Sequence, residues 1–371
     1  MRGNNVLGIL FSNMKDQTIR ELTEMRTMGS VPVGGRYRLI DFPLSNMANS
    51  GITRVGVVTK SNYRSLMDHV GSGKAWNMSR KHSGLVFLPP YGSGNVLYQN
   101  RIGALSGIRE FLESSKEEFV FMADCDVVAN MDIQEVVRAH VAKGADITVV
   151  YKRGELPDNM DGTTTLSVDM DGRVREVLLH SRDTGVHTFD TSMYVVRREF
   201  LIQLINDAVS HNLKDFEADI LQAGVTRYRI FGFEHKGYAG IVTSMNSYYQ
   251  LNKSLLDADV RAQLFPMDRP IYTKVRDDMP ARYGMGASVK NSLVADGCVI
   301  EGEVENCVLF RGVTIKKGAR VRNSIIMQSS IIGENCDIDY LILDKDVEIH
   351  SDRRLMGFES YPVYISKGSR V

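Results

Sequence analysis

Short apolar runs alternate with amphipathic stretches along residues 1–245. Five runs rich in β-branched and aromatic residues predict strands, and they begin at Val6, Arg54, Gly84, Glu118 and Asp146. Between them, residues 102–114 and 133–144 carry apolar positions three and four apart, which predicts helices. This alternation is typical of a mostly parallel sheet covered by helices on both faces. Ligands of such sheets bind at the carboxyl ends of the strands.

The pattern changes near Tyr283 to a repeat of six residues. One column of this repeat is apolar except for one aspartate, and it consists of Val313, Ala319, Ile325, Ile331, Asp337, Leu343 and Ile349. The residues directly before its first five members are small, namely Gly312, Gly318, Ser324, Ser330 and Cys336. This pattern predicts a parallel β-helix with three short strands in each coil. An antiparallel sandwich with chance spacing fits less well, because sandwich strands alternate every two residues.

Length and charge limit the classes of function. The chain has 371 residues, of which 43% are hydrophobic, so it can bury a large core and form two or three domains. Lys and Arg number 45, as do Asp and Glu, which disfavours nucleic acid and anionic membranes as partners. The chain shows neither an apolar run of the roughly 18 residues that span a membrane nor a signal peptide at its start. We therefore expect a cytoplasmic protein.

Cysteine and histidine spacing does not indicate a metal site. The four cysteines, Cys125, Cys298, Cys307 and Cys336, are too widely spaced for a C-x-x-C ligand pair or a disulfide framework. The eight histidines form no H-x-x-x-H or H-E-x-x-H pattern. We expect buried reduced thiols and no protein-bound transition metal.

The stretch "SVPVGGRYRLIDFPLSNMANSGITRVGVVT", from Ser30 to Thr59, is the most informative one. Taken alone, it predicts a turn at Gly34 and Gly35, then a strand and a helix capped near Ser45 or Asn46. It closely resembles the "FGGKYRIIDFPLSN...NSGI" signature of the glucose-1-phosphate adenylyltransferases. The resemblance continues in "FMADCDVVANMD", "YYQLNKSLL" and "NSLVADGCVIEGEVENCVLF", and so covers nearly the whole chain.

The resemblance implies a fold and a reaction. It predicts an α/β nucleotidyltransferase-like (Rossmann-like) domain at residues 1–245, a helical linker at 246–282 and a left-handed parallel β-helix at 283–371. Active members make ADP-glucose and pyrophosphate from ATP and glucose 1-phosphate. These substrates bring several negative charges together. The family therefore uses a glycine-rich loop, basic residues and two carboxylates that hold Mg²⁺.

Positions that bind phosphate in the family are changed in this chain. The G-G-x-G-T-R-L loop of the family aligns with residues 13–19, and the lysines of its K-P-A-V and E-K-P runs align further along. At these positions the chain has Asn13, Met14, Asp16, Thr18, Met28 and His180. Asp16 adds a negative charge where phosphates would lie, which costs on the order of 1 to 4 kcal/mol at about 4 Å. The loop is therefore not expected to cradle a triphosphate.

Of the two metal-binding carboxylates of the family, this chain retains one and replaces the other. The first maps onto Asp126, which is retained. The second belongs to G-Y-W-R-D-x-G-T, which aligns with "GYAGIVTS", residues 237–244, and places Ile241 at the aspartate position. One carboxylate alone holds Mg²⁺ poorly. We therefore expect no catalysis by this chain and no cofactor of its own, with Mg²⁺ bound by a catalytic partner.

Three functions are compatible with these changes. The pattern is similar to the non-catalytic GlgD-type regulatory subunits of Gram-positive bacteria, which implies a catalytic glucose-1-phosphate adenylyltransferase subunit as partner in a homo- or hetero-tetramer. The alternatives are an active enzyme with a remodelled loop and a stand-alone sugar or nucleotide sensor. The run "PYGSGN" matches a base-contacting segment of the family. It offers weak nucleotide-binding candidates, or else a tight surface turn, at Gly92, Ser93, Gly94 and Asn95.

Three arginines are candidates for an effector site. In the resembling family, sugar-phosphate activators bind in a basic crevice between the two domains. The corresponding runs here, "RTMGSV" and "GGRYR", supply Arg26, Arg36 and Arg38. Arginine forks suit bidentate phosphate contacts. The alternative is that these arginines are solvated or paired with carboxylates such as Asp41.

Overall fold

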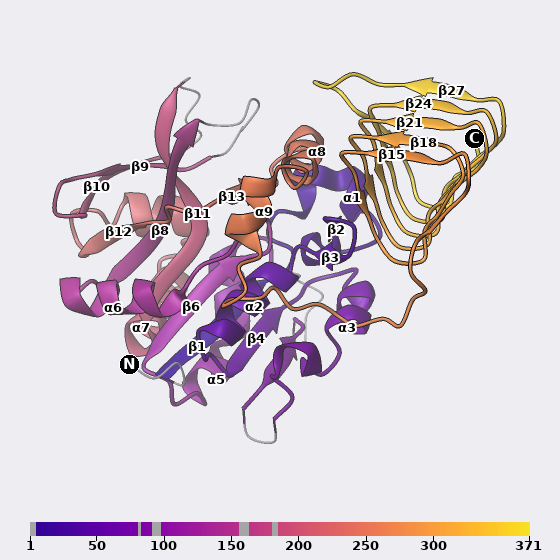
Figure 1. Cartoon of the computed structure of the whole chain (residues 1–371). Helices are drawn as coiled ribbons and strands as arrows, with labels where there is room; N and C mark the ends of the chain where they lie inside the picture. The colour runs from indigo at the N-terminus through magenta and orange to yellow at the C-terminus, as the bar shows by residue number, and fades with distance from the viewer. Residues whose placement is uncertain (1–4, 81–82, 91–97, 156–162, 180–184) are drawn as a thin grey trace.

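The computed structural model describes the chain except for residues 1–4, 81–82, 91–97, 156–162 and 180–184. Figure 1 shows an α/β domain and, beside it, a stack of flat coils that contains the C-terminus. The described strands of the main sheet are β1 (Val6–Phe11), β4 (Arg54–Val58), β5 (Leu85–Leu88), β6 (Phe119–Asp124), β8 (Ile147–Glu155), β9 (Thr165–Val168), β10 (Val174–Leu178), β11 (Val186–Arg197) and β12 (Ile230–Glu234).

Helices and short strands surround this sheet. The α-helices are α1 (Arg20–Thr23), α2 (Asp41–Asn49), α3 (Arg64–Val70), α4 (Arg101–Gly107), α5 (Arg109–Glu113), α6 (Ile133–Lys143), α7 (Arg198–Ser210), α8 (Met245–Ser254) and α9 (Ala258–Leu264). A π-helical segment, η5, covers Phe216–Gln222. Two short pairs complete the domain, β2 (Pro32–Val33) with β3 (Tyr37–Arg38) and β7 (Val127–Ala129) with β13 (Ala239–Ile241).

The sheet is mixed. Its strand order is β10-β9-β11-β6-β1-β4-β5, with β8 beside β11 and β12 beside β8. β1 pairs in parallel with both β4 and β6, and β5 pairs in parallel with β4, whereas β11 runs antiparallel to β6 and β8. The carboxyl ends of β1 and β6 therefore meet at one edge, where the loops that follow them lie together.

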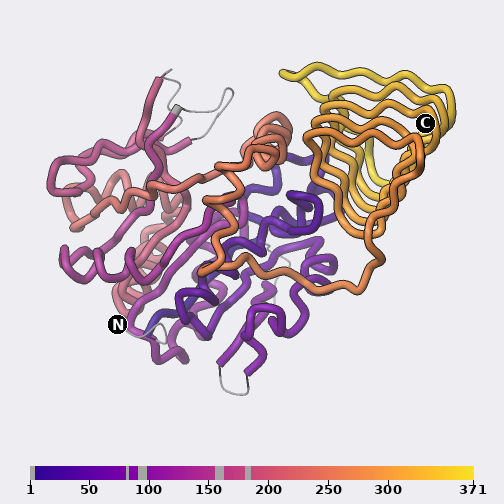
Figure 2. The backbone as a smooth tube through the Cα atoms, in the orientation of Figure 1, coloured from indigo at the N-terminus to yellow at the C-terminus, as the bar shows by residue number. Residues whose placement is uncertain are grey.

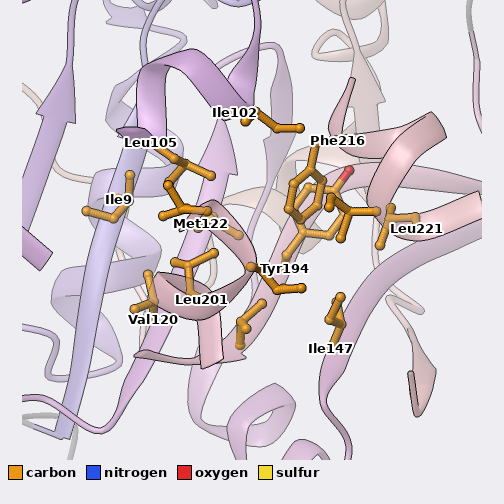
Figure 3. Close-up of a cluster of buried hydrophobic side chains, with 14 of the residues drawn as sticks. Ile9, Ile102, Leu105, Val120, Met122, Ile147, Tyr194, Leu201, Phe216 and Leu221 are labelled. Carbon is orange, nitrogen blue, oxygen red and sulfur yellow. The ribbon is translucent and has the colours of Figure 1, made fainter. Parts of the chain in front are cut away.

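Helices cover both faces of the sheet, as predicted. Leu7, Ile9 and Phe11 of β1 belong to a core with α4, α5, α7 and η5, whereas Val6 and Leu10 belong to a core with α2, α3 and α6. Figure 3 shows the first core, in which side chains of α4, α7 and η5 gather over the strands. Successive side chains of a strand point to opposite faces, so a strand buried on both sides must be apolar throughout.

Two helix predictions differ from the structure in detail. The predicted helix 102–114 is broken at Ile108 into α4 and α5. The helix predicted to be capped near Ser45 begins earlier, at Asp41, and Ser45 lies one turn inside it and donates to the Asp41 carbonyl. Pro43 is compatible with this earlier start, because the first turn of a helix needs no donor from its backbone nitrogen.

The C-terminal part is a β-helix of three parallel sheets. Residues 282–365, all of which the structure describes, give each sheet five strands. The first sheet contains β14 (Arg282–Tyr283), β17 (Val299–Ile300), β20 (Thr314–Ile315), β23 (Ile331–Ile332) and β26 (Glu348–Ile349). The second contains β15 (Ser288–Lys290), β18 (Glu303–Glu305), β21 (Arg320–Arg322), β24 (Asp337–Asp339) and β27 (Arg354–Met356). The third contains β16 (Leu293–Val294), β19 (Val308–Leu309), β22 (Ile325–Ile326), β25 (Leu341–Leu343) and β28 (Val363–Ile365).

The predicted six-residue column is wrong in the middle of the β-helix. Thr314 pairs with Ile331, and Arg320 pairs with Asp337, so one coil has 17 residues and not three times six. The shortened step moves the column from the interior to the outside: Asp337 is only partly buried, whereas its neighbour Ile338 is fully buried. Ile325 and Ile331 likewise lie outside the interior of the β-helix, which contains Ile326 and Ile332 instead. Ile325 is buried in a different core, the one shared with the α/β domain. All four cysteines are buried and free, as expected.

The third sheet of the β-helix packs against the α/β domain. Val308, Ile325 and Ile342 share an apolar core with Tyr248 and Tyr249 of α8 and with N-terminal residues that include Ile19, Leu22 and Met28. After α9 the chain runs back along α2 and α3, seen in orange in Figure 2. Ser45 accepts from the Tyr272 amide at 2.8 Å, and Lys274 donates to the Asp68 carbonyl at 2.6 Å. This extended segment, residues 266–281, and the shared core hold the two domains together.

The division into residues 1–245, 246–282 and 283–371 stays a prediction. α8 starts at Met245 and β14 at Arg282. In the described part of the chain, none of the helices has the length and apolar character needed to cross a membrane.

Replacement of His140 by Asn is expected to reduce the loss of stability on acidification. His140 lies buried between α6 and β8, with its Nδ1 2.8 Å from the Thr148 hydroxyl. Burial and the nearby Arg197 lower its pKa to about 4. The unfolded chain, with a histidine pKa of about 6.5, binds the proton first as the pH falls, so this group removes stability below pH 6.5. Between pH 7 and pH 5 the loss is about 2 kcal/mol.

Urea unfolding of both proteins at the two pH values measures this difference. The Asn variant should lose about 2 kcal/mol less free energy of unfolding than the parent protein. Equal losses in the two proteins would show that His140 does not titrate in this window.

Candidate nucleotide site

A small polar cavity lies where the loops after β1 and β6 meet. Its volume is about 60 Å³, which holds a few water molecules. It is lined by Lys15, Thr18, Asp126, Thr163, Thr164, Asp190, Ser192, Glu217, Ile241 and Thr243. Thr18, Asp126 and Ile241 were predicted from the sequence as altered or retained positions of one site, and the structure brings them together.

The loop after β1 is held by its own side chains. Asp16 accepts from the Met28 amide at 2.8 Å, and Thr18 donates to the Lys15 carbonyl at 2.8 Å. The Tyr98 hydroxyl donates to Asn13 at 3.2 Å. Burial raises the pKa of Asp16 to about 6. Met14 is not part of the cavity lining and packs against the first core.

Some predicted residues cannot be placed. His180 and the nucleotide candidates Gly92, Ser93, Gly94 and Asn95 lie outside the described residues. Their predicted roles therefore stay predictions.

Asp126 is a buried carboxylate that faces an isoleucine. It follows the end of β6, its side chain is 3% exposed, and its Oδ1 has no hydrogen-bond partner among the described residues. Burial and the neighbouring Asp124 raise its pKa to about 7. β13 runs beside it, since the Asp126 carbonyl accepts from the Val242 amide at 2.9 Å, and Ile241 lines the same cavity.

Two cations lie among the carboxylates of this site. Lys15 lines the cavity, and although burial lowers its pKa, Asp126, Asp124 and Glu217 raise it on balance. Arg101 makes two bonds to Asp124, of 2.9 and 3.0 Å, and one to Glu217 of 3.3 Å. Its guanidinium also lies over the rings of Phe11, Tyr194 and Phe216, at 4.8, 5.2 and 5.7 Å.

Arg101, Asp190 and Glu217 belong to this site but were not predicted from the sequence. Asp190 accepts from the Tyr194 hydroxyl, and burial raises its pKa to about 7. One signal was available for Arg101: it opens a helix, where the positive end of the helix dipole disfavours a cation. A basic residue at that position indicates that another group compensates its charge.

The donor set at the cavity does not fit a magnesium ion. Mg²⁺ prefers several oxygen ligands in octahedral geometry. Here Asp126 lines the cavity together with Ile241 and Lys15, and both oxygens of Asp124 already accept from Arg101. Among the described residues, no group of three His, Cys, Asp or Glu side chains is arranged to hold a metal ion.

A second polar region lies between the two domains. Arg26 forms a bidentate ion pair with Asp344 of the β-helix, at 2.9 and 2.8 Å, and both side chains are buried. Asp344 also accepts from the Tyr364 hydroxyl at 3.0 Å. The guanidinium of Arg26 is thus engaged by a carboxylate, as in the alternative considered for these arginines, although its partner is Asp344 and not Asp41.

Other cations surround this ion pair. Arg38 donates to the Ser65 carbonyl at 2.6 Å, and its pKa is lowered to about 10 by burial and by Arg26 and Arg276. The pKa of Lys345 is lowered to about 7 by burial and by Arg38 and Arg26. Arg36 is exposed and lies 5.6 Å from the Tyr37 ring. Positive charges from both domains therefore converge beside Asp344.

Asp41, the predicted partner of these arginines, is used differently. It is buried, and its Oδ1 lies 2.6 Å from Nε2 of His69. Its Oδ2 accepts from the backbone amide of Arg38 and not from the guanidinium. The Arg38 side chain therefore keeps donors for other groups.

Two known protein families match the two domains of the fold, in the same order along the chain. A model described as "Nucleotidyl transferase" matches residues 17–255, and one described as "GlmU-like, C-terminal hexapeptide" matches residues 275–360. The chain belongs to the nucleotidyl transferase family. The predicted order of an α/β nucleotidyltransferase-like domain and a left-handed β-helix is confirmed.

Individual relatives show more closely which members of this family the chain resembles. "Glycogen biosynthesis protein GlgD" of Bacillus subtilis is 36% identical over 369 residues, which cover 99% of this chain and 97% of the relative. The protein of the same name from Geobacillus stearothermophilus is 37% identical, over 86% of this chain and 83% of the relative. "Glucose-1-phosphate adenylyltransferase" of Fervidobacterium nodosum is 29% identical, over 89% of this chain and 80% of the relative. The predicted resemblance to this adenylyltransferase family and its GlgD-type members is confirmed.

Proposed function

We propose that this chain is a non-catalytic regulatory and assembly subunit in glycogen biosynthesis. It modulates a catalytic glucose-1-phosphate adenylyltransferase subunit, which binds Mg²⁺ and makes ADP-glucose and pyrophosphate. The observation that carries the proposal is the cavity of about 60 Å³, in which Lys15 and Ile241 face Asp126. The name of the Bacillus subtilis relative supports the pathway.

Two properties of the part of the cavity that described residues line, its volume of about 60 Å³ and its carboxylates, support the proposed absence of substrate turnover. A bound hexose phosphate and a triphosphate need a site of several hundred cubic ångströms. The carboxylates of Asp126 and Glu217 and the nearby Asp16 repel phosphate at short range. These features favour the regulatory function over an active enzyme with a remodelled loop and over a nucleotide sensor that uses this cavity.

Co-purification and kinetics test the proposal. The chain is co-expressed with a catalytic glucose-1-phosphate adenylyltransferase subunit, and ADP-glucose formation is compared with that of the catalytic subunit alone. We expect the two chains to elute together and the mixed enzyme to differ in its substrate affinity or activator response. Separate elution with unchanged kinetics would reject the proposed function.

The basic region between the domains is proposed as the effector site. Arg38 and Lys345 bring cations from both domains together, while Arg26 holds the domains in place through Asp344. A sugar phosphate bound here would contact both domains at once. A ligand that binds two states of an assembly unequally shifts the equilibrium between them, with a coupling of about 1 to 3 kcal/mol.

Replacement of both Arg38 and Lys345 by Ala is expected to blunt activation of the mixed enzyme. Two charge-assisted contacts to phosphate would be lost, so the activator concentration for half-maximal effect should rise by about tenfold or more. Titration of the mixed enzyme with a panel of sugar phosphates measures this. Lys316→Ala, which removes an exposed charge of the β-helix, is the matched control. An unchanged activator response would exclude this region as the effector site.

Truncation before Ser288 is expected to abolish tetramers. The stacked flat faces of the β-helix suit pairing between subunits, and its third sheet also covers apolar residues of the α/β domain such as Tyr248 and Tyr249. The fragment 1–287 should be monomeric or aggregated in light scattering, beside the full chain as control. A fragment that still forms a defined tetramer would place the interface in the α/β domain.

A further inference from the structure

The candidate nucleotide site contains buried carboxylates that are not all paired with a cation in the described part of the chain. Asp124, Asp126 and Glu217 lie together beneath the loop after β1. Arg101 satisfies Asp124 with two bonds and reaches Glu217 with a third. The side chain of Asp126 is 3% exposed, and its Oδ1 has no partner in the described part of the chain. A buried carboxylate without a counter-charge is strongly destabilising, so a second cation is needed.

Lys15 is placed to supply that cation. Its side chain lines the same small cavity as Asp126 and Glu217. The hydroxyl groups of Thr163, Thr164 and Ser192, which also line the cavity, offer further acceptors for the three N–H bonds of an ammonium.

The loop residues around Lys15 fix its position. The Lys15 carbonyl accepts from both the amide and the hydroxyl of Thr18, at 3.1 and 2.8 Å. The next residue, Asp16, is anchored to the Met28 amide. These contacts fix the backbone of the turn from which the Lys15 side chain reaches the cavity that Asp126 and Glu217 also line.

We propose that the ammonium group of Lys15 occupies the electrostatic role of a divalent cation at this site, so that the chain neutralises its own buried carboxylates. The inference rests on the proposed absence of metal-dependent catalysis. Without Lys15, the carboxylates of Asp126 and Glu217 lose this counter-charge, so they should attract a hard divalent cation that enters the cavity. The parent protein should therefore be insensitive to divalent cations, and loss of Lys15 should create a dependence on them.

Lys15→Met tests this, with Mn²⁺ as the probe. The variant removes the charge and keeps most of the side-chain volume. Without metal, its melting temperature should lie a few degrees below that of the parent chain. Mn²⁺ at 1 mM should restore most of this loss and have no effect on the parent chain. Electron paramagnetic resonance should show Mn²⁺ bound at least about tenfold more tightly by the variant than by the parent.

Two further variants make the result specific. Lys15→Met with Asp126→Asn removes both charges, so it should melt near the parent temperature and lose the Mn²⁺ response. Lys60→Met, which removes another partly buried lysine after β4, should leave the Mn²⁺ response absent. If Lys15→Met alone does not fold, folding of the double variant supports the proposal and its failure to fold overturns it.

Other outcomes contradict the inference directly. An unchanged melting temperature in Lys15→Met, or equal Mn²⁺ binding by variant and parent, would show that Lys15 does not act as the counter-charge. These results are independent of turnover. ADP-glucose synthesis by the unpartnered chain would instead refute the proposed function while leaving the Lys15 measurements interpretable.

Discussion

The isolated chain is expected to form no measurable ADP-glucose from ATP, glucose 1-phosphate and Mg²⁺, and to show no pyrophosphorolysis. The loop after β1 is held by Asp16, Thr18 and Asn13 side chains, and Ile241 stands where a second carboxylate would be needed. Removal of one preorganised contact to the transition state already costs about a hundred- to a thousandfold in rate, and the proposed function implies the loss of several.

A pyrophosphate-release assay with a relative active as an adenylyltransferase as positive control measures this. A turnover number in the usual enzyme range, about 1 to 1,000 per second, would contradict the expectation. Ile241→Asp alone should not restore activity. The second carboxylate would then be present, but Lys15 would still line the cavity and the loop would still lack the glycines of the family.

Arg26→Ala is expected to lower the free energy of unfolding by about 3 to 5 kcal/mol. The variant leaves the Asp344 carboxylate buried, with the Lys345 amide and the Tyr364 hydroxyl as its remaining donors among the described residues. This ion pair joins the α/β domain to the β-helix, so its loss should also loosen the junction between them. Urea unfolding and limited proteolysis of the junction measure the two effects.

Two variants serve as controls for this prediction. Arg320→Ala removes an arginine from the exposed pair with Glu303 on the β-helix, whose side chains are 65% and 61% exposed, and should cost less than about 1 kcal/mol. Arg26→Met with Asp344→Leu replaces the buried pair by apolar side chains and should be less destabilising than Arg26→Ala alone. A small effect of Arg26→Ala, equal to that of Arg320→Ala, would show that the buried pair is not needed.

The sequence predicted most of the fold because apolar periodicity is a local property. The strands that begin at Val6 and Phe119 are continuous apolar runs, and burial on both faces of the sheet requires such runs. The repeat after Tyr283 predicted the β-helix. Its register could not be followed past Ala319, because a coil of 17 residues also satisfies the packing and only the stacked neighbours determine which residue points inward.

The candidate site was predictable only in part. Alignment with a known motif pointed to Asp126, Thr18 and Ile241, which line one cavity. It could not indicate that Arg101 neutralises Asp124 or that Arg26 pairs with Asp344, since these partners lie 23 and 318 residues apart. Charge compensation depends on three-dimensional proximity, which a linear pattern does not contain.

The apolar core shared by the two domains has a consequence for synthesis on the ribosome. Ile19, Leu22 and Met28 are made early, whereas their partners Ile325 and Ile342 come near the end of the chain. At about 5 to 20 residues per second, roughly 16 to 60 s separate Arg26 from Asp344, which lie 318 residues apart. During that interval the nascent α/β domain displays an uncovered apolar surface. Chaperone binding to the growing chain should therefore persist until the last coils emerge.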